Sequence, residues 1–225
     1  MTTKTGEPIE RMSELLYSLG GISPKRVMLR PHPGTATEQD LLAHVDRTGR
    51  LAELIDGVVV EKPMGFGESH IAGEILWMIR THLAAIDLGI VVGEAAMMRL
   101  MPGLVRAPDV SFLIWEKLPG RKMPSEPVPG FAPDLAVEVL SKSNTKGEMT
   151  RKIRDYFFHG VRLVWIVDPA RRNVRVLTPD GGETTLSEAD SLDGGDVLPG
   201  PKIPIAPLFA TMPDGPAPRK RRSAK

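Results

Sequence analysis

The sequence contains no cysteine, which excludes both disulfide bridges and thiolate metal sites. Any metal ion would have to be held by oxygen atoms or histidine nitrogens, and oxygen ligands favour a hard cation such as Mg²⁺. Aromatic residues are also few, at 5% of the 225 residues. The sequence shows no secretory signal pattern and no apolar run long enough to cross a bilayer. We therefore predict a cytoplasmic protein with no membrane contact.

The chain has no large excess of either charge. It carries 29 Lys and Arg against 28 Asp and Glu, a formal net charge of +1. This balance excludes the basic composition of a tight non-specific nucleic-acid binder, so any contact with nucleic acid must be local. A phosphate-binding glycine motif of the P-loop type is absent as well. The 41% hydrophobic and 25% charged residues are those of an ordinary globular protein, not of a disordered or collagen-like chain.

The length suits one compact domain with extensions. We expect an N-terminal arm over residues 1–36, a main domain over 37–210 and a basic, solvated tail over 211–225. The tail contains Arg219 to Arg222, for which solvent exposure is favoured and phosphate binding is the alternative.

Local patterns in the first half predict helices and strands with turn signals between them. An Asp56-Gly57 pair between two apolar runs predicts a hairpin over residues 51–60. Helical spacing predicts a helix from Ser69 to about Asp87, ended by Gly89. A shorter helix is expected at residues 38–44, and three neighbouring strands of one sheet are expected at 90–92, 96–101 and 105–115.

The second half predicts a βαβ crossover. Apolar runs at residues 135–140 and 163–167 are typical of buried strands, and a helix capped by Ser143 or Asn144 would connect them. A further strand over 173–178 should pair with the second of these. Pro207 to Phe209 is expected to be a last packed contact before the tail.

Glu138 is the one acid within the apolar run at 135–140. Because an unpaired buried carboxylate would sooner take up a proton, Glu138 should meet a metal ion, a cation or several hydrogen-bond donors. Asp109 follows Pro108 in a neighbouring predicted strand. If the two strands lie side by side, both carboxylates could converge on one Mg²⁺, with the Val139 carbonyl and waters completing the octahedron. Such an ion could activate a water for phosphodiester hydrolysis.

Lys152 lies on the helix that follows Glu138. At about 100° per residue, Met149, Lys152 and Tyr156 share the inward side of this helix, whereas Arg151, Arg154 and Asp155 should point away. The Lys152 ammonium could then orient the attacking water or stabilise the developing charge.

Pro108-Asp109, Glu138-Val139-Leu140 and Lys152 resemble the PD-(D/E)xK nuclease superfamily, which has the restriction-endonuclease-like fold. The chain departs from that pattern at Leu140, where the usual lysine lies, so Lys152 would be a migrated substitute. Several motifs over about residues 37–180 together resemble the bacterial Uma-two family of restriction endonucleases. These are Glu53-Leu-Ile-Asp-Gly57, His70, Arg106-Ala-Pro-Asp109, Asp134-Leu-Ala-Val-Glu-Val-Leu-Ser141, Lys152 with Tyr156, and Val164-Trp-Ile-Val-Asp-Pro169.

The resemblance implies an α/β domain with a central mixed sheet flanked by helices and an N-terminal hairpin region. It further implies a homodimeric endonuclease that uses Mg²⁺ or Mn²⁺ to cut nucleic acid, with DNA as the expected substrate. Asp109 and Glu138 would be metal ligands and Lys152 the catalytic lysine.

Other interpretations stay open at this point. Asp109 and Glu138 could form structural ion pairs with Arg106 or Lys152, and Lys152 could instead pair with Glu148 one turn earlier. The domain could be an inactive nuclease-fold module for DNA binding or assembly, or it could hydrolyse another phosphate ester.

Glu53, His70 and Glu94 are accessory candidates for the site. Ordinary hairpin and strand-end positions are favoured for Glu53 and Glu94. For His70, at the start of a predicted helix, capping or packing weighs equally with contact to a phosphate.

Overall fold

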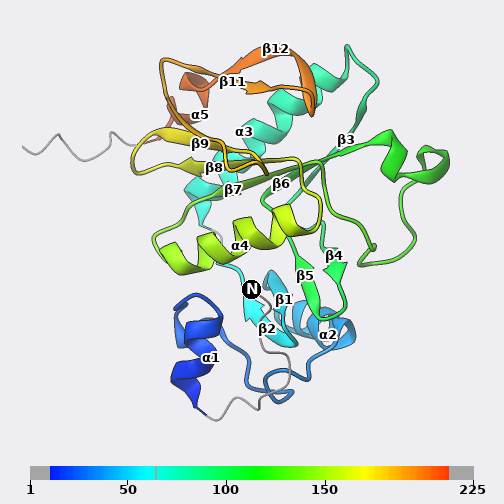
Figure 1. Ribbon diagram of the computed structural model, residues 1–225, viewed down its shortest axis with the longest axis vertical. Coiled ribbons are helices and arrows are strands. Elements are labelled where there is room, and N and C mark those ends of the chain that lie inside the picture. The colour runs from blue at the N-terminus through cyan, green and yellow to red at the C-terminus, as the bar shows by residue number, and fades with distance from the viewer. Residues whose placement is uncertain (1–10, 64, 213–225) are drawn as a thin grey trace, which may run out of the picture.

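A six-stranded mixed sheet forms the centre of the protein (Figure 1). The computed structural model describes residues 11–63 and 65–212. In spatial order the strands are β10 (Glu183–Ser187), β9 (Asn173–Leu177), β8 (Leu163–Asp168), β7 (Leu135–Val139), β6 (Val110–Ile114) and β3 (Gly89–Gly93). Only β7 and β8 pair in parallel within this sheet; the other neighbours are antiparallel.

The predicted βαβ crossover is confirmed, with α4 (Lys146–Phe158) connecting β7 to β8. Thr145 caps this helix by accepting a 3.0 Å hydrogen bond from the backbone N–H of Glu148, whose side chain reaches back to Thr145. This reciprocal arrangement satisfies two backbone donors at the helix start. The cap therefore lies one residue after Asn144, the later of the two predicted positions.

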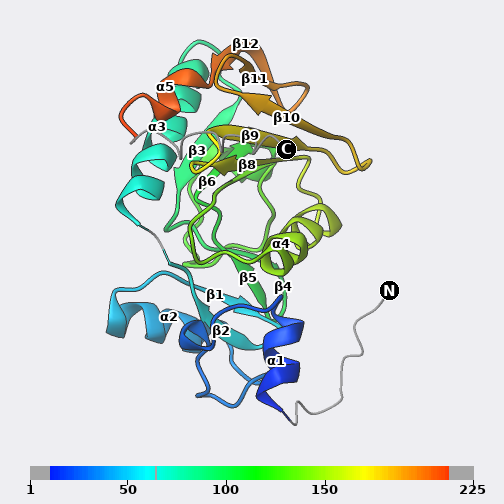
Figure 2. The same ribbon diagram turned by 90° about the vertical axis from the view of Figure 1, so that its left-hand side faces the viewer.

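Helices cover both faces of the central sheet (Figure 2). The long helix α3 (Phe66–Leu83) packs on one face, where Leu135, Val137 and Val139 join its side chains in the main hydrophobic core. Helix α4 covers the other face, where Ala136 packs with Tyr156. Because side chains alternate along a strand, Glu138 lies on the face covered by α4.

A second sheet lies beneath the first, in the order β2 (Val58–Glu61), β1 (Ala52–Ile55), β5 (Leu104–Arg106) and β4 (Met98–Met101). The predicted hairpin is confirmed, since β1 and β2 pair across Asp56 and Gly57, which have φ values of 50° and 69°. Both central residues of such a turn need positive φ, which Asp tolerates and Gly adopts freely. A Cβ at Gly57 would also lie 2.6 Å from the carbonyl oxygen of Gly34.

The described part of the N-terminal arm packs against this second sheet. Helix α1 (Met12–Ser18) and the 3₁₀ turn η1 (Pro24–Arg26) lie on it, and α2 (Glu38–Thr48) contacts β1. Leu15 and Leu19 share a small hydrophobic core with Ile55 and Val58. Burial of these side chains holds the arm to the hairpin.

The sequence predicts one strand over residues 105–115, but the structure has two separate strands there. The strand is interrupted at Ala107, Pro108 and Asp109. As a result β5 belongs to the second, lower sheet (β2, β1, β5 and β4), and β6 belongs to the central sheet. Proline has no backbone N–H to donate and therefore interrupts strand pairing. The expectation that residues 90–115 form neighbouring strands of a single sheet is consequently wrong.

The limits of α3 also differ from the prediction. The helix begins at Phe66 after Gly65 and ends at Leu83, so Ser69 is not its cap. Gly89 is the first residue of β3 and does not end the helix.

The proline-rich connection between β6 and β7 holds two 3₁₀ turns, η2 (Trp115–Lys117) and η3 (Pro119–Arg121). After β10, a two-stranded sheet of β11 (Ser191–Gly194) and β12 (Leu198–Pro204) leads to α5 (Ala206–Phe209). Leu208 and Phe209 are fully buried, which confirms the expected last packed contact. Residues 1–10 of the predicted arm and the tail from Pro213 onward, with Arg219 to Arg222, lie outside the described residues, and the domain limits stay predictions.

Candidate active site

The interruption between β5 and β6 at Pro108 brings Asp109 next to the strand that carries Glu138. Val110 pairs with Val137 in antiparallel register, and continuing this register sets Asp109 opposite Glu138. The backbone N–H of Asp109 donates to the carbonyl of Val137 at 3.0 Å. In return, the backbone N–H of Val139 donates to Oδ2 of Asp109 at 2.6 Å. The two acids are 2% and 4% exposed, so the expected meeting of the two strands creates a buried pair of carboxylates.

Lys152 points into the protein from α4, as the helical phase predicts. Its Nζ lies 3.1 Å from Oε2 of Glu138 and 3.1 Å from Oε1 of Glu53. The hydroxyl of Tyr156, one turn further along, donates to Oε1 of Glu138. Glu148 is not the partner of Lys152, because it binds the Arg26 guanidinium at 2.6 Å. Glu53 thus lies inside the charged cluster and not at an ordinary surface position of the hairpin.

Arg106 connects this cluster to the lower sheet. Its Nη1 donates to Oε2 of Glu53 at 2.8 Å, and its Nη2 donates to Asp155. The backbone N–H of Ala107 donates to the other oxygen of Glu53 at 3.1 Å. Asp155 is buried, so the prediction that it points away from the protein is wrong. Helix α4 lies between the central sheet and the lower lobe, which consists of the lower sheet and the helices packed on it (Figure 1). More than one side of α4 is consequently covered.

Lys62 is the member of the cluster that the sequence analysis missed. Its Nζ lies 2.7 Å from Oδ1 of Asp109 and donates to the carbonyl oxygen of Ala107. The side chain is only 7% exposed. In sequence Lys62 is one lysine following a hairpin strand, and nothing in its surroundings indicates that the chain turns it toward Asp109.

Burial and neighbouring charges shift the pKa values of this cluster in different directions. Burial raises the pKa of Glu138, and the nearby charges of Asp109 and Glu53 add to this rise, while Lys152 and Lys62 oppose it. Burial acts in the same direction on Glu53, but Lys152, Arg106 and Lys62 outweigh it and hold the Glu53 pKa below its ordinary value. Glu138 is therefore the carboxyl that more readily takes up a proton.

The cationic and phenolic groups are also shifted. Burial would lower the pKa of Lys152, but the carboxylates of Glu138 and Glu53 raise it above its ordinary value, so the ammonium stays charged. Burial and the charge of Glu138 raise the pKa of Tyr156, which stays a hydrogen-bond donor.

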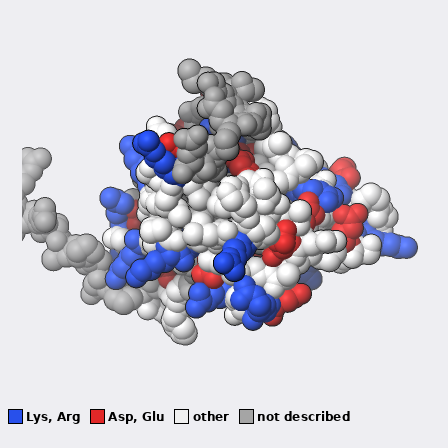
Figure 3. Space-filling view, turned by 90° about the horizontal axis from the view of Figure 1, so that it is seen from below, with Lys and Arg blue, Asp and Glu red and all other residues white. Residues whose placement is uncertain are grey.

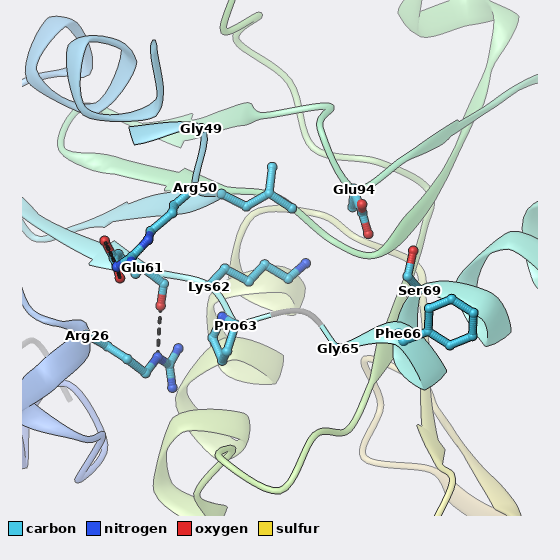
Figure 4. A pocket seen from close by; sticks show the side chains of 11 residues that line it. Arg26, Gly49, Arg50, Glu61, Lys62, Pro63, Gly65, Phe66, Ser69 and Glu94 are labelled. Carbon is cyan, nitrogen blue, oxygen red and sulfur yellow. Dashed lines mark hydrogen bonds and ion pairs between the residues drawn. The ribbon is translucent and has the colours of Figure 1, made fainter. Parts of the chain in front are cut away.

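A pocket of about 730 Å³ adjoins the cluster through Lys62, which is one of its lining residues (Figure 4). Glu94 lines the same pocket on the opposite side from Arg50 and Arg26. Glu94, one of the three accessory candidates, therefore shares this pocket with Lys62. His70 lies elsewhere, since its Nε2 pairs with the Thr211 hydroxyl at 2.6 Å.

Comparison with known proteins places this arrangement in a family. Residues 38–206 match the Uma-two (Uma2) family, which is described as "Putative restriction endonuclease". The chain belongs to the Uma-two family. A crystal structure from Anabaena variabilis ATCC 29413, described as a "putative nuclease belonging to DUF820", is similar at 22% identity with a TM-score of 0.64. The similarity covers 72% of this chain and 92% of that one, and at this identity it shows the fold alone.

Comparison with curated proteins finds no match to the chain. The family and the related structure together confirm the predicted restriction-endonuclease-like α/β fold, and the family supports a nuclease.

This Uma-two protein has an apolar residue two positions after Glu138. Leu140 packs against the hydrophobic cluster beneath α4, and its backbone N–H donates to Val167 of the neighbouring strand at 2.8 Å. Lys152 brings an ammonium to Glu138 from the following helix instead. An ammonium from α4 thus contacts Glu138, whereas residue 140 contributes an apolar side chain.

The residues of this Uma-two protein fit a magnesium-type ion. Oδ1 of Asp109 is buried, and the ammonium of Lys62 lies 2.7 Å from it, so a cation already meets this oxygen. Mg²⁺ binds through one or two carboxylates and keeps several waters, so Asp109 and Glu138 would be the protein ligands of such an ion. Among residues 11–63 and 65–212, no group of three or more His, Asp or Glu side chains is arranged to hold a metal ion.

Proposed function

We propose that this protein is a metal-dependent endonuclease that hydrolyses phosphodiester bonds of nucleic acid, with DNA as its substrate. Asp109 and Glu138 would hold Mg²⁺ or Mn²⁺, and Lys152 would be the catalytic lysine. The observation that carries the proposal is the buried ammonium of Lys152, 3.1 Å from both Glu138 and Glu53, in a cluster that an open pocket reaches through Lys62. Membership of a restriction endonuclease family supports it.

The chemistry assigned to each residue follows from its surroundings. A divalent ion held by Asp109 and Glu138 would lower the pKa of a bound water and neutralise charge on a phosphoryl oxygen. Lys152 stays protonated between two carboxylates, so it acts as a hydrogen-bond donor that orients a water or stabilises negative charge, and not as a base. Tyr156 fixes the Glu138 side chain from its other oxygen.

Contact with nucleic acid is expected to be local. On the face seen from below, Lys and Arg side chains are interspersed with Asp and Glu (Figure 3). This distribution agrees with the net charge of +1 and would give weak non-specific attraction to phosphates. Arg50 lines the pocket with a side chain that is 69% exposed, and its guanidinium, which pairs with Glu61 at 3.0 Å, would exchange that partner for a phosphate.

The cellular setting and assembly belong to the same proposal. No helix within the described residues is long and apolar enough to span a membrane. We propose that the protein acts in the cytoplasm, and as a homodimer because cutting both strands of a duplex suits two symmetric sites.

An inactive scaffold with the nuclease fold is the second candidate. It is favoured by the pairing of both central carboxylates with lysines, Asp109 with Lys62 and Glu138 with Lys152. Such a cluster is compensated in charge without a metal ion. A scaffold of this kind would show no change in melting temperature on addition of Mn²⁺, whereas a metal-dependent enzyme would be stabilised.

The experiment that tests the proposed activity is a cleavage assay on several substrates. Supercoiled plasmid, single-stranded DNA and single-stranded RNA would each be incubated with the purified protein in Mg²⁺, Mn²⁺ or EDTA. The proposal expects DNA cleavage with either metal and none with EDTA. Cleavage of RNA alone would correct the substrate, and inactivity on all three substrates would contradict the proposal. Hydrolysis of a small phosphate ester without cleavage of any nucleic acid would identify a different phosphoesterase.

The role of Lys152 needs a separate comparison. Lys152→Ala, Asp109→Ala and Glu138→Ala would be assayed side by side after their melting temperatures have shown that they fold. The role assigned to Lys152 predicts loss of cleavage in all three. Full activity of Lys152→Ala beside two inactive carboxylate variants would remove the lysine from the mechanism.

A further inference from the structure

Lys62 enters the charged cluster from outside the two strands and the helix that build it. It follows β2, and its backbone N–H is anchored to the carbonyl of Leu51 at 2.8 Å. The side chain extends from this fixed point across the wall of the pocket (Figure 4). Its ammonium ends 2.7 Å from Oδ1 of Asp109 and donates to the carbonyl oxygen of Ala107. The backbone is thus held, while the ammonium is placed by these two partners at the end of a rotatable side chain.

Lys62 is one of three cations that compensate the acids of the cluster. Four buried carboxylates, from Glu53, Asp109, Glu138 and Asp155, face the cations of Lys62, Lys152 and Arg106. A divalent ion bound by Asp109 and Glu138 would add two positive charges beside the ammonium groups of Lys62 and Lys152 in a buried site. Like charges at such short range repel strongly where water is excluded, so entry of the ion favours departure of a cation.

Lys62 is the cation best placed to leave. Lys152 is held between two carboxylates, and Arg106 is held by Glu53 and Asp155, so each has acidic partners on two residues. Lys62 pairs with one carboxylate and one backbone carbonyl, and it already lines an open pocket of about 730 Å³. Rotation of its side chain into that pocket would return the ammonium to water without moving the backbone.

We propose that Lys62 is a positioning residue that occupies the cation place at Asp109 in the metal-free protein and vacates it when a divalent ion binds. The inference rests on the proposed function, since it assigns the ion to Asp109. In this arrangement Lys62 keeps the buried carboxylate compensated before the metal arrives. Once released, its ammonium lies in the pocket, where it can contact a substrate phosphate.

Direct measurement of Mn²⁺ binding tests this inference without reference to activity. The dissociation constant of the full-length protein for Mn²⁺ would be determined by electron paramagnetic resonance for the wild type and for Lys62→Met. If Mn²⁺ binds only to molecules in which Lys62 has left Asp109, the apparent affinity for Mn²⁺ is the intrinsic affinity multiplied by the fraction of such molecules. If Lys62 occupies Asp109 in about nine molecules of ten, its removal should tighten Mn²⁺ binding about tenfold.

Three further variants make the comparison specific. Lys62→Gln removes the charge but keeps a donor for the Ala107 carbonyl, and it gives the same test if Lys62→Met does not fold. Lys62→Arg keeps the competing charge and should bind Mn²⁺ no more tightly than the wild type. Lys117→Met is the matched control, because Lys117 also pairs with a buried aspartate, Asp134 at 3.2 Å, and an alanine carbonyl, but lies outside the cluster. It should leave Mn²⁺ affinity unchanged.

The possible results separate this inference from the proposed function. Tighter Mn²⁺ binding by the neutral Lys62 variants supports the inference, whereas a merely structural lysine would lower the melting temperature without tightening Mn²⁺ binding. The inference alone is overturned if the wild type binds Mn²⁺, Asp109→Asn abolishes this binding, and the neutral Lys62 variants bind Mn²⁺ no more tightly than the wild type. Absence of binding in the wild type and in every Lys62 variant overturns both the inference and the metal-dependent function.

Discussion

Asp109 accepts a 2.6 Å hydrogen bond from the backbone N–H of Val139, the residue that follows Glu138. One oxygen of the Asp109 carboxylate is therefore tied to the strand that carries the second acid. The other oxygen is paired with the Lys62 ammonium at 2.7 Å. Asp109 thus has one oxygen tied to the strand and one oxygen that faces a cation, and a substitution that preserves the first can test the second.

Asp109→Asn retains an oxygen for the Val139 N–H but removes the negative charge. We expect Mn²⁺ to raise the melting temperature of the wild type and not that of the variant. At a free Mn²⁺ concentration of 100 times the dissociation constant, binding would stabilise the wild type by about 2.7 kcal/mol. Differential scanning fluorimetry with and without Mn²⁺ measures this difference.

Asp134→Asn is the control for that comparison. Asp134 is equally buried, accepts a hydrogen bond from the backbone N–H of Ile114 at 3.1 Å and pairs with Lys117. It should retain the full response to Mn²⁺. An equal response of Asp109→Asn and the wild type would remove Asp109 from the metal site.

Arg106→Lys tests the connection between the charged cluster and the lower sheet. The guanidinium of Arg106 binds Glu53 and Asp155 at once, and a lysine ammonium cannot span both in the same way. Loss of a hydrogen bond to a buried charged group predicts destabilisation by about 1.5 to 3 kcal/mol, measured by urea unfolding. The half-exposed pair of Arg175 and Glu183 provides a control, since Arg175→Lys should change stability by less than about 1 kcal/mol. Equal effects of the two substitutions would contradict the structural role of Arg106.

Glu148 gives the stability of the protein a defined pH dependence. Burial alone would raise the Glu148 pKa, but the hydrogen bond and charge of Arg26 outweigh it and lower the pKa below the ordinary value of 4.5. A carboxyl with a lowered folded-state pKa stabilises the protein fully above its ordinary pKa, and this contribution is lost as the pH falls through the folded-state value. Glu148→Gln should therefore be less stable than the wild type at pH 7, by about 1 to 3 kcal/mol.

The difference in unfolding free energy between Glu148→Gln and the wild type should shrink as the pH falls below 4.5. Urea unfolding at several pH values measures it directly. Because other carboxyl groups titrate in both proteins, the difference isolates position 148. A difference that stays constant from pH 7 down to pH 3 would show that the ion pair with Arg26 contributes nothing.

Local signals in the sequence were sufficient for much of the fold and for the central pair of acids. Asp56-Gly57 specifies its hairpin because the turn needs positive φ at both positions. Glu138 stands out because a single acid in a buried strand needs partners, and the structure provides Lys152 and Tyr156. The hairpin depends on chain neighbours and the inward phase of Lys152 and Tyr156 on helical turns, which the sequence alone contains. The meeting of Asp109 with Glu138 also required that β6 and β7 lie side by side.

The remaining members of the cluster depend on how distant segments pack. Asp155 is on the side of α4 that the helical phase assigns to solvent, but the lower lobe covers that side and Arg106 meets it there. Lys62 reaches Asp109 only because the segment after β2 passes close to residues 107–109, which separate β5 from β6. Neither relationship has a periodicity or spacing that a single sequence could show.

The most direct test of the proposed activity compares the rate of DNA cleavage by the wild type with that of Glu138→Gln, which keeps the size of the side chain and one of its two acceptor oxygens but removes its charge. Both proteins would be shown to be folded and assayed on supercoiled plasmid with saturating Mn²⁺. We expect metal-dependent cleavage by the wild type, abolished by EDTA, and a loss of at least about a hundredfold in the variant. Equal cleavage rates for the two proteins, or cleavage that persists in EDTA, would contradict it.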